Sequence, residues 1–268
     1  MIPVLRVCYA IMERTLWLQT CGTLKYHKRS VHNLKGITMT SIDIDNGNSR
    51  LNPSDDFGKL IKMYKEKHAQ GEGMFNGRSL LKFVDLIKAY LELNNCKSVM
   101  DYGCGKGILY GEDYKTITNE IDCPLPEYWN IEDFVLYDPA YEKYSTRPGQ
   151  KRDAVVCTDV LEHIAKDDLS WVVDEIFGYA RKMVFINVAC FKAMKTLPDG
   201  RNAHISVFDP DDWLQLFAHK SRDYKHLTIY VFADTMTDQD TKTFETLGYR
   251  IDQYPRIIKM KNKAGEKE

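Results

Sequence analysis

The residues best suited to chemistry are three glycines at alternate positions and the aspartate before them: Asp101, Gly103, Gly105 and Gly107. They follow a short apolar run, 98–100, that predicts a buried strand. Glycines allow a tight turn and let the backbone approach a ligand with no side chain in the way. The carboxylate can accept hydrogen bonds from a hydroxyl group or meet a cation. The segment therefore predicts a strand–loop–helix junction that contacts a bound ligand.

Two more aspartates stand at the ends of predicted strands. Asp138 ends an apolar run at 134–137, and Asp159 follows another at 153–157. In open α/β sheets, ligands bind in the crevice beyond the carboxyl ends of the strands. We therefore expect Asp101, Asp138 and Asp159 to meet at one ligand site.

The elements that position these residues alternate along the chain. Strands bounded by helical segments predict an α/β fold with a doubly wound, mostly parallel sheet. Helices are expected at 57–65, 80–91, 169–177, 211–218 and 238–247, the last ending at Gly248. Strands are expected at 98–102, 134–137, 153–157, 183–188, 227–232 and 249–254.

The composition indicates an ordinary globular protein, with 44% apolar and 28% charged residues. A net charge of -1 gives no global attraction to nucleic acid or anionic lipid. The cysteines are scattered, without a CxxC pair or a His/Cys cluster at zinc spacing, which favours reduced thiols in a cytosolic protein. No apolar run reaches the roughly 18 residues that a membrane span needs.

The two ends of the chain differ from its centre. Residues 1–41 are basic with a single acid, Glu13, which is typical of a transit peptide or of an extension upstream of a natural start at Met39. We favour the second interpretation. We expect a poorly ordered N-terminal extension at 1–54, one domain at 55–258 and a basic tail at 259–268.

Three segments resemble one family. The string DYGCGKG at 101–107 resembles motif I of the class I S-adenosylmethionine (SAM)-dependent methyltransferases. The string DVLEHI at 159–164 resembles their motif IV, with a likeness to ubiquinone-biosynthesis O-methyltransferases. The string LPDGRNAH at 197–204 is similar to one in phage and bacterial methyltransferases of unassigned substrate. The resemblance implies a Rossmann-like sheet of seven strands with an N-terminal helical cap, in the cytoplasm of a bacterium or a phage-infected host cell.

The resemblance also implies SAM as the cofactor. Its binding residues would be Asp101, Gly103, Cys104, Gly105, Gly107, Asp138, Asp159 and Val160, with Asp138 on the ribose hydroxyls. Two alternatives stay open. The glycine turn is a packing corner without a ligand, or the site binds NAD, although a dinucleotide fold prefers G-x-G-x-x-G without the long insertion at 111–133.

Two histidines are candidates for the chemistry of methyl transfer. We expect His204 to act as a general base, with His163 as second candidate, and Arg201 and Asn202 to bind the acceptor. The alternative is that these residues only brace their loops. Asp159, Glu162 and His163 are residue types that bind metal ions, but no fourth ligand stands at motif spacing, so we expect no metal.

The methyl acceptor is predicted from residue composition and from the absence of known motifs. A small molecule, or a sugar of a glycan or nucleotide, is preferred. DNA is disfavoured because neither a basic-aromatic stripe nor an Asn/Asp-Pro-Pro-Tyr motif is present. The alternatives are a SAM-binding regulatory or partner protein without transfer activity and, more weakly, an NAD(P)-dependent oxidoreductase. No membrane partner is expected, and the oligomeric state stays open.

Overall fold

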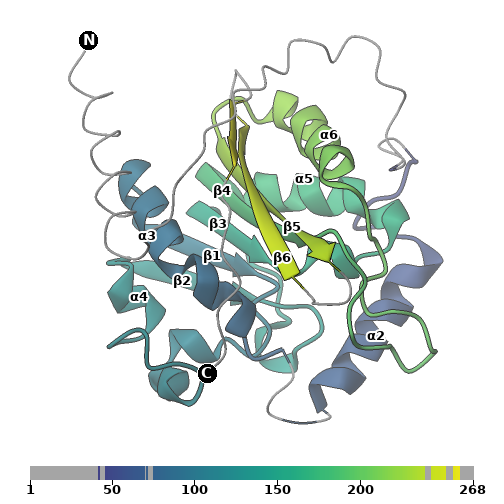
Figure 1. Ribbon diagram of the computed structural model, residues 1–268, viewed down its shortest axis with the longest axis horizontal. Coiled ribbons are helices and arrows are strands. Elements are labelled where there is room, and N and C mark those ends of the chain that lie inside the picture. The colour runs from purple at the N-terminus through teal and green to yellow at the C-terminus, as the bar shows by residue number, and fades with distance from the viewer. Residues whose placement is uncertain are drawn as a thin grey trace.

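A central sheet with helices on both faces organises the computed structural model (Figure 1), which describes residues 42, 46–69, 71, 75–238, 243–251 and 256–259. Its strands are β1 (Ser98–Tyr102), β2 (Asp133–Tyr137), β3 (Arg152–Thr158), β4 (Ala180–Ala189), β5 (Thr228–Asp238), β6 (Thr243–Ile251) and β7 (Arg256–Lys259). They lie in the order β2-β1-β3-β4-β5-β6-β7, with parallel pairing from β2 to β5 and antiparallel pairing of β6 and β7. The predicted α/β fold with a mostly parallel sheet is confirmed.

The helices cover both faces of this sheet. The α-helices are α2 (Asp55–Ala69), α3 (Val84–Leu93), α4 (Leu125–Tyr128), α5 (Leu169–Tyr179) and α6 (Pro210–Lys220). Short 3-10 turns are η1 (Arg78–Phe83), η2 (Ile108–Tyr110), η3 (Glu112–Thr116), η4 (Glu142–Tyr144), η5 (Leu161–His163), η6 (Lys166–Asp168) and η7 (Ser221–Asp223). Figure 1 shows α3 and α4 on one face and α5 and α6 on the other.

The period of two along the buried strands builds a core on each face. In β4, Val184 and Ile186 pack with α5 and α6, whereas Phe185 between them packs with α3. Successive strand side chains point to opposite faces, so strands buried on both sides are apolar throughout. This explains why short apolar runs, rather than alternating ones, mark these strands in the sequence.

The strand order places a crevice beside β1. The chain leaves β1 for β2 on one side and returns to β3 on the other. At such a switch point the connections diverge and leave space beyond the carboxyl ends of the strands. The end of β1, which carries Asp101, meets there the segments that follow β2 and β3, which carry Asp138 and Asp159.

The helix predicted at 238–247 is wrong. Residues from Thr243 belong to β6, which pairs with β5 from Ile229–Ile251 to Asp238–Thr243. β-branched and aromatic residues such as Thr243 and Phe244 favour a strand, and pairing with a central strand outweighs a weak helical pattern. Gly248, expected to end a helix, lies inside the strand opposite Phe232.

The described part of the N-terminal extension contacts the domain. Arg50 pairs with Glu175, with its Nε 2.8 Å from Oε2, and the Ser54 amide donates to Asp168 Oδ1 at 2.9 Å. These contacts differ from the poor packing expected for 1–54. Residues 1–41 and 260–268 lie outside the described residues, and the division into three parts stays a prediction.

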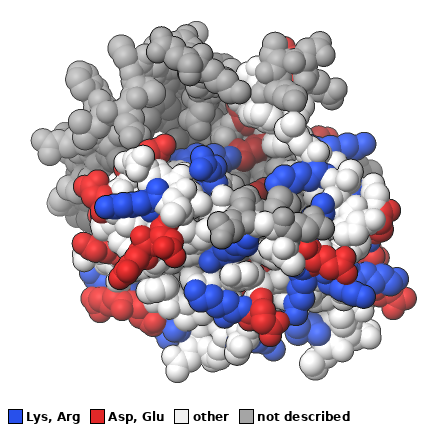
Figure 2. Space-filling view, turned by 90° about the horizontal axis from the view of Figure 1, so that it is seen from below, with Lys and Arg blue, Asp and Glu red and all other residues white. Residues whose placement is uncertain are grey.

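The face drawn in Figure 2 carries charged side chains of both signs. On the face in Figure 2, the coloured Lys and Arg side chains lie among Asp and Glu side chains. Within the described ranges, no helix combines the length and apolarity needed to cross a membrane. The cysteines of these ranges are free: Cys96, Cys104, Cys123, Cys157 and Cys190.

Candidate functional site

The loop after β1 needs its glycines for two reasons. Gly103, Gly105 and Gly107 have positive φ angles of 83°, 56° and 61°. A Cβ on Gly103 would lie 2.3 Å from Cγ2 of Val160, and one on Gly105 would lie 2.3 Å from the carbonyl oxygen of Phe75. L-residues rarely adopt this conformation, and these contacts are far below van der Waals distance. The close approach that requires glycine is therefore to neighbouring segments of the chain itself.

Asp138 joins the end of β2 to this loop. Its Oδ2 accepts a hydrogen bond from the Gly105 amide at 2.9 Å, and its Oδ1 accepts one from the Ala140 amide at 2.8 Å. Burial raises the pKa of Asp138, and the amide donors oppose that shift. His68 Nε2 lies 3.9 Å from Oδ2. Burial and the nearby Lys106 lower the pKa of His68 to about 4, so the imidazole is neutral at pH 7.

Asp101 lies at the buried end of β1 and is 5% exposed. Burial raises its pKa to about 7, the nearby Tyr110 hydroxyl opposes the shift, and the Asp138 carboxylate adds to it. A carboxyl group with this pKa is partly protonated at neutral pH and can then donate as well as accept a hydrogen bond.

Replacing Asp101 by asparagine is expected to reduce the loss of stability with rising pH. The folded pKa of about 7 lies above the ordinary 3.8, so this carboxyl destabilises the folded protein increasingly as pH rises from about 4 to 7. Asparagine has a similar shape and does not ionise. Urea unfolding should show that the wild type loses about 2–3 kcal/mol more than Asp101→Asn between pH 5 and pH 8. Parallel pH profiles of the two proteins would contradict this expectation.

A first pocket opens at the crevice beside β1. Its empty space, including the part open to solvent, is about 1080 Å³. Among the lining residues are nine of the predicted site residues: Asp101, Gly103, Cys104, Gly105, Gly107, Asp138, Asp159, Val160 and His163. The α2 residues Phe57, Leu60 and Tyr64 form an apolar wall of the same pocket. An apolar cavity with a few convergent polar groups is typical of a small-molecule site.

A second pocket adjoins the first and shares part of its wall. Tyr64, Phe75, Asp159 and His163 line both pockets. The remaining wall of the second pocket includes His204 and the loop segment 193–197 that follows β4. Two ligands in these neighbouring pockets would therefore face each other across Asp159 and His163.

Asp159 is held in an unusual backbone conformation at this shared wall. Its φ is 59°, a left-handed value that Asp tolerates better than most residues. Its amide donates to the Asn187 carbonyl at 3.2 Å, and its side chain is 44% exposed. Residues held in sparsely populated conformations cluster at functional sites, and here the turn directs a carboxylate between the two pockets.

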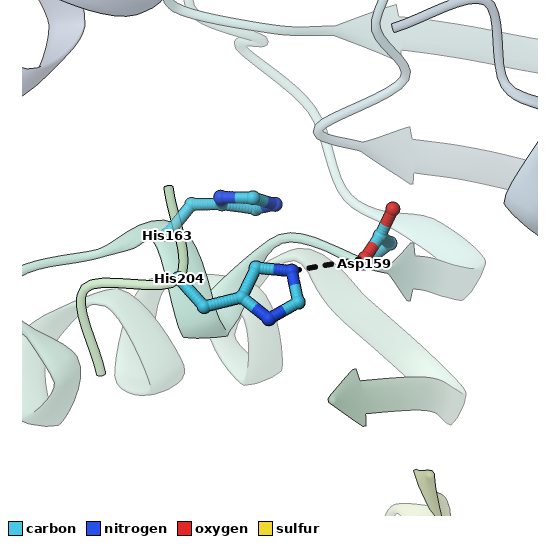
Figure 3. Close-up of side chains that lie close together, drawn as sticks. All are labelled: Asp159, His163 and His204. Carbon is cyan, nitrogen blue, oxygen red and sulfur yellow. Dashed lines mark ion pairs between the residues drawn. The ribbon is translucent and has the colours of Figure 1, made fainter. Parts of the chain in front are cut away.

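His163 and His204 meet Asp159 in one cluster (Figure 3). His163 Nδ1 lies 2.7 Å from the Ala203 carbonyl, and His204 Nδ1 lies 2.6 Å from the Phe191 carbonyl. His204 Nε2 lies 4.0 Å from Asp159 Oδ1. Burial lowers the pKa of His163, with Asp159 opposing the shift and His204 adding to it. The sequence spacing does not reveal this cluster, because His204 comes from a loop far along the chain.

Glu162, between Asp159 and His163 in sequence, is fully buried. Its Oε1 accepts a hydrogen bond from the Ala189 amide at 2.7 Å, while Oε2 has no hydrogen-bond donor in the described part of the chain. Burial and the neighbouring Asp159 carboxylate raise the pKa of Glu162 well above its ordinary value.

Arg201 and Asn202 line neither pocket. Arg201 pairs with Asp56 at 2.5 Å and with Asp199 at 2.7 Å. Asn202 Oδ1 accepts hydrogen bonds from the Ala193 amide at 2.9 Å and from the His204 amide at 3.0 Å. Both side chains therefore brace the loop that carries His204, which is the alternative left open in the sequence.

Three further residues line the pockets without having been assigned to a site. Tyr64 is buried in a core cluster, and its hydroxyl lies 3.1 Å from His163 Nδ1 and donates to the Ala203 carbonyl at 2.7 Å. The rings of His68 and Phe75 are in contact, with centroids 4.6 Å apart and an interplanar angle of 38°. No motif marks Phe75, and only the helical period of Tyr64 and His68 links them as neighbours on one face of α2. The assignment of all these residues to binding or catalysis stays a prediction.

Comparison with known proteins gives one family match. A family model described as a methyltransferase domain matches residues 74–226, more than half of the chain. Among solved structures, magnesium protoporphyrin IX methyltransferase from Synechocystis with bound SAH is 17% identical, over 75% of this chain and 94% of that chain. The TM-score of this match is 0.33, which is too low to support an inference about this chain. No curated protein matches the chain.

Proposed function

Because the chain belongs to the methyltransferase domain family, with SAM as its methyl donor, we propose that it methylates a small molecule or a sugar of a glycan or nucleotide. The observation that carries this proposal is the pair of pockets with a common wall of Tyr64, Phe75, Asp159 and His163. A donor in one pocket and an acceptor in the other would meet at this wall. Neighbouring sites of this kind are what a direct transfer between two bound molecules needs.

In this proposal the first pocket holds SAM. The loop 103–107 faces the methionine end, and Asp138 accepts hydrogen bonds from the ribose hydroxyls through the lone pairs that the Gly105 and Ala140 amides leave free. Helix α2 acts as the N-terminal helical cap, since its apolar face lines the pocket. Strand β7 completes the sheet as its seventh strand.

The transfer is a single displacement. An acceptor oxygen or nitrogen forms a bond to the methyl carbon, the carbon–sulfur bond breaks, and its electron pair stays on sulfur. The acceptor proton leaves to a base. His204 is the assigned base, because its Nδ1 faces a carbonyl and its Nε2 therefore carries the lone pair. Arg201 and Asn202 position His204 through the loop rather than touching the acceptor.

The test is methyl transfer from labelled SAM to fractions of a cell lysate. We expect label to enter a small-molecule or glycan fraction, and His204→Ala to reduce the rate at least about 100-fold, as for loss of a general base. His226→Ala is the matched control, because His226 is exposed just before β5 begins and lines neither pocket. SAM binding without an acceptor in any fraction would instead favour a regulatory SAM-binding protein.

A further inference from the structure

We propose that Asp159, His163 and His204 bind a divalent first-row transition metal ion at the wall between the two pockets. The ligand atoms that these three side chains offer all lie within 4.8 Å of one another. Two atoms each about 2.1 Å from one ion lie about 3–4 Å apart. Small rotations of the side chains therefore bring all three onto one ion. Figure 3 shows both imidazole rings turned toward the Asp159 carboxylate.

The backbone fixes both rings in the form that binds metals. A carbonyl only accepts hydrogen bonds, so the Nδ1 atoms that face Ala203 and Phe191 carry the protons. The neutral rings then present the lone pairs of their Nε2 atoms. Metal-binding histidines almost always donate their other ring N–H to a carbonyl or carboxylate in this way. Tyr64 adds a second group that holds the His163 ring.

A buried carboxyl oxygen with no hydrogen-bond partner among the described residues lies beside the cluster and gives a second, geometric indication of a cation. Glu162 is fully buried next to Asp159, and its Oε2 has no donor within the described ranges. Two adjacent carboxylates of which one is buried are costly unless a cation or proton balances them. An ion bound by Asp159 would lie close enough to supply that charge.

The donor set points to the class of ion. Two imidazole nitrogens and a carboxylate suit Zn²⁺, Fe²⁺, Co²⁺ or Mn²⁺, whereas Mg²⁺ and Ca²⁺ prefer oxygen ligands alone. Three protein ligands leave coordination positions open, and the second pocket lies on that side because Asp159, His163 and His204 all line it.

The role of the ion deepens the proposed function and rests on it. A hydroxyl oxygen of the acceptor binds the ion, which lowers the pKa of the hydroxyl. The proton leaves to water, and the oxygen forms the bond to the methyl carbon while the carbon–sulfur pair stays on sulfur. The acceptor class is therefore a hydroxyl compound. With the ion bound, His163 and His204 act as ligands, and the ion takes over the role that the proposed function assigns to His204 as the base.

The binding test uses Co²⁺ titrated into the full chain after treatment with a chelator, followed by its visible absorption. We expect one Co²⁺ per chain, and an affinity at least about tenfold lower in His204→Ala and in Asp159→Asn. Asparagine suits the left-handed conformation of residue 159, so this variant keeps the fold. His226→Ala is the control and should bind as the wild type. Equal affinity in all four proteins, or no binding by the wild type, would overturn the site.

The activity test separates the metal from the proposed function. A chelator should abolish label transfer in the lysate assay, and added Zn²⁺, Mn²⁺ or Co²⁺ should restore it. The affinity for SAM, measured by calorimetry, should be the same with and without the chelator. Transfer at full rate in the chelator would overturn the metal's role and leave methyl transfer standing. Failure to bind SAM, with or without metal, would instead overturn the proposed function. The Co²⁺ titration would then still show whether the metal site exists.

Discussion

Asp138→Ala is expected to raise the Kd for SAM, measured by calorimetry, at least about 100-fold. Two hydrogen bonds from the ribose to a charged carboxylate are worth about 1.5–3 kcal/mol each, and every 1.4 kcal/mol is a factor of ten. The substitution also removes the acceptor of the Gly105 and Ala140 amides, which shapes the loop. The effect on binding therefore exceeds the loss of the ribose contacts alone.

The matched control for Asp138 is Asp133→Ala. Asp133 begins the same strand that Asp138 follows, and its side chain is 56% exposed and paired with Arg152 at 2.9 Å. The Asp133→Ala substitution should leave the Kd for SAM unchanged. In both variants, the affinity for S-adenosylhomocysteine should change by the same factor as the affinity for SAM. Unchanged affinity in Asp138→Ala, or tighter binding of NAD than of SAM by the wild type, would refute the cofactor assignment.

Gly105→Ala is expected to lower the free energy of unfolding by about 2–5 kcal/mol and to abolish SAM binding. The left-handed conformation costs an L-residue about 1–2 kcal/mol, and overpacking costs about 1–3 kcal/mol more. The new Cβ meets the Phe75 carbonyl, a backbone atom that cannot rotate away. Urea unfolding and calorimetry measure the two effects.

Gly103 offers an internal comparison for this prediction. Its Cβ would meet the two Cγ atoms of Val160, so Val160→Ala should recover part of the stability lost in Gly103→Ala but none of that lost in Gly105→Ala. Gly149→Ala is the control, because nothing lies within 4 Å of its Cβ position. A loss in Gly149→Ala equal to that in Gly105→Ala would show that the close contacts do not matter.

The crevice could be predicted because its signals are local. Buried parallel strands are short apolar runs, and the residues after them lie at one edge of the sheet whatever the details of packing. For that reason Asp101, Asp138 and Asp159 come together as expected. Glycines at alternate positions likewise predict a tight turn without knowledge of its neighbours.

The partners of polar side chains could not be predicted in the same way. Residue types alone made Arg201 a candidate for the acceptor, but Asp56 from α2 and Asp199 already occupy its guanidinium. The meeting of His163 with His204 depends on how the loop after β4 folds back. The first part of β6 was predicted as a helix because its pairing with β5 decides the conformation of a segment whose local preferences are weak.

The wall of the second pocket has two parts, and this has a consequence for how the acceptor specificity of such a protein changes in evolution. One part of its wall, with Tyr64, Asp159 and His163, also serves the first pocket, so changes there disturb both ligands. Most of the rest comes from the loop after β4, in which Met194 is 85% exposed. Substitutions in that loop alter the shape offered to the acceptor while the donor pocket stays intact. A change of acceptor specificity therefore needs substitutions only in one loop that tolerates them, while the residues that bind the methyl donor stay the same.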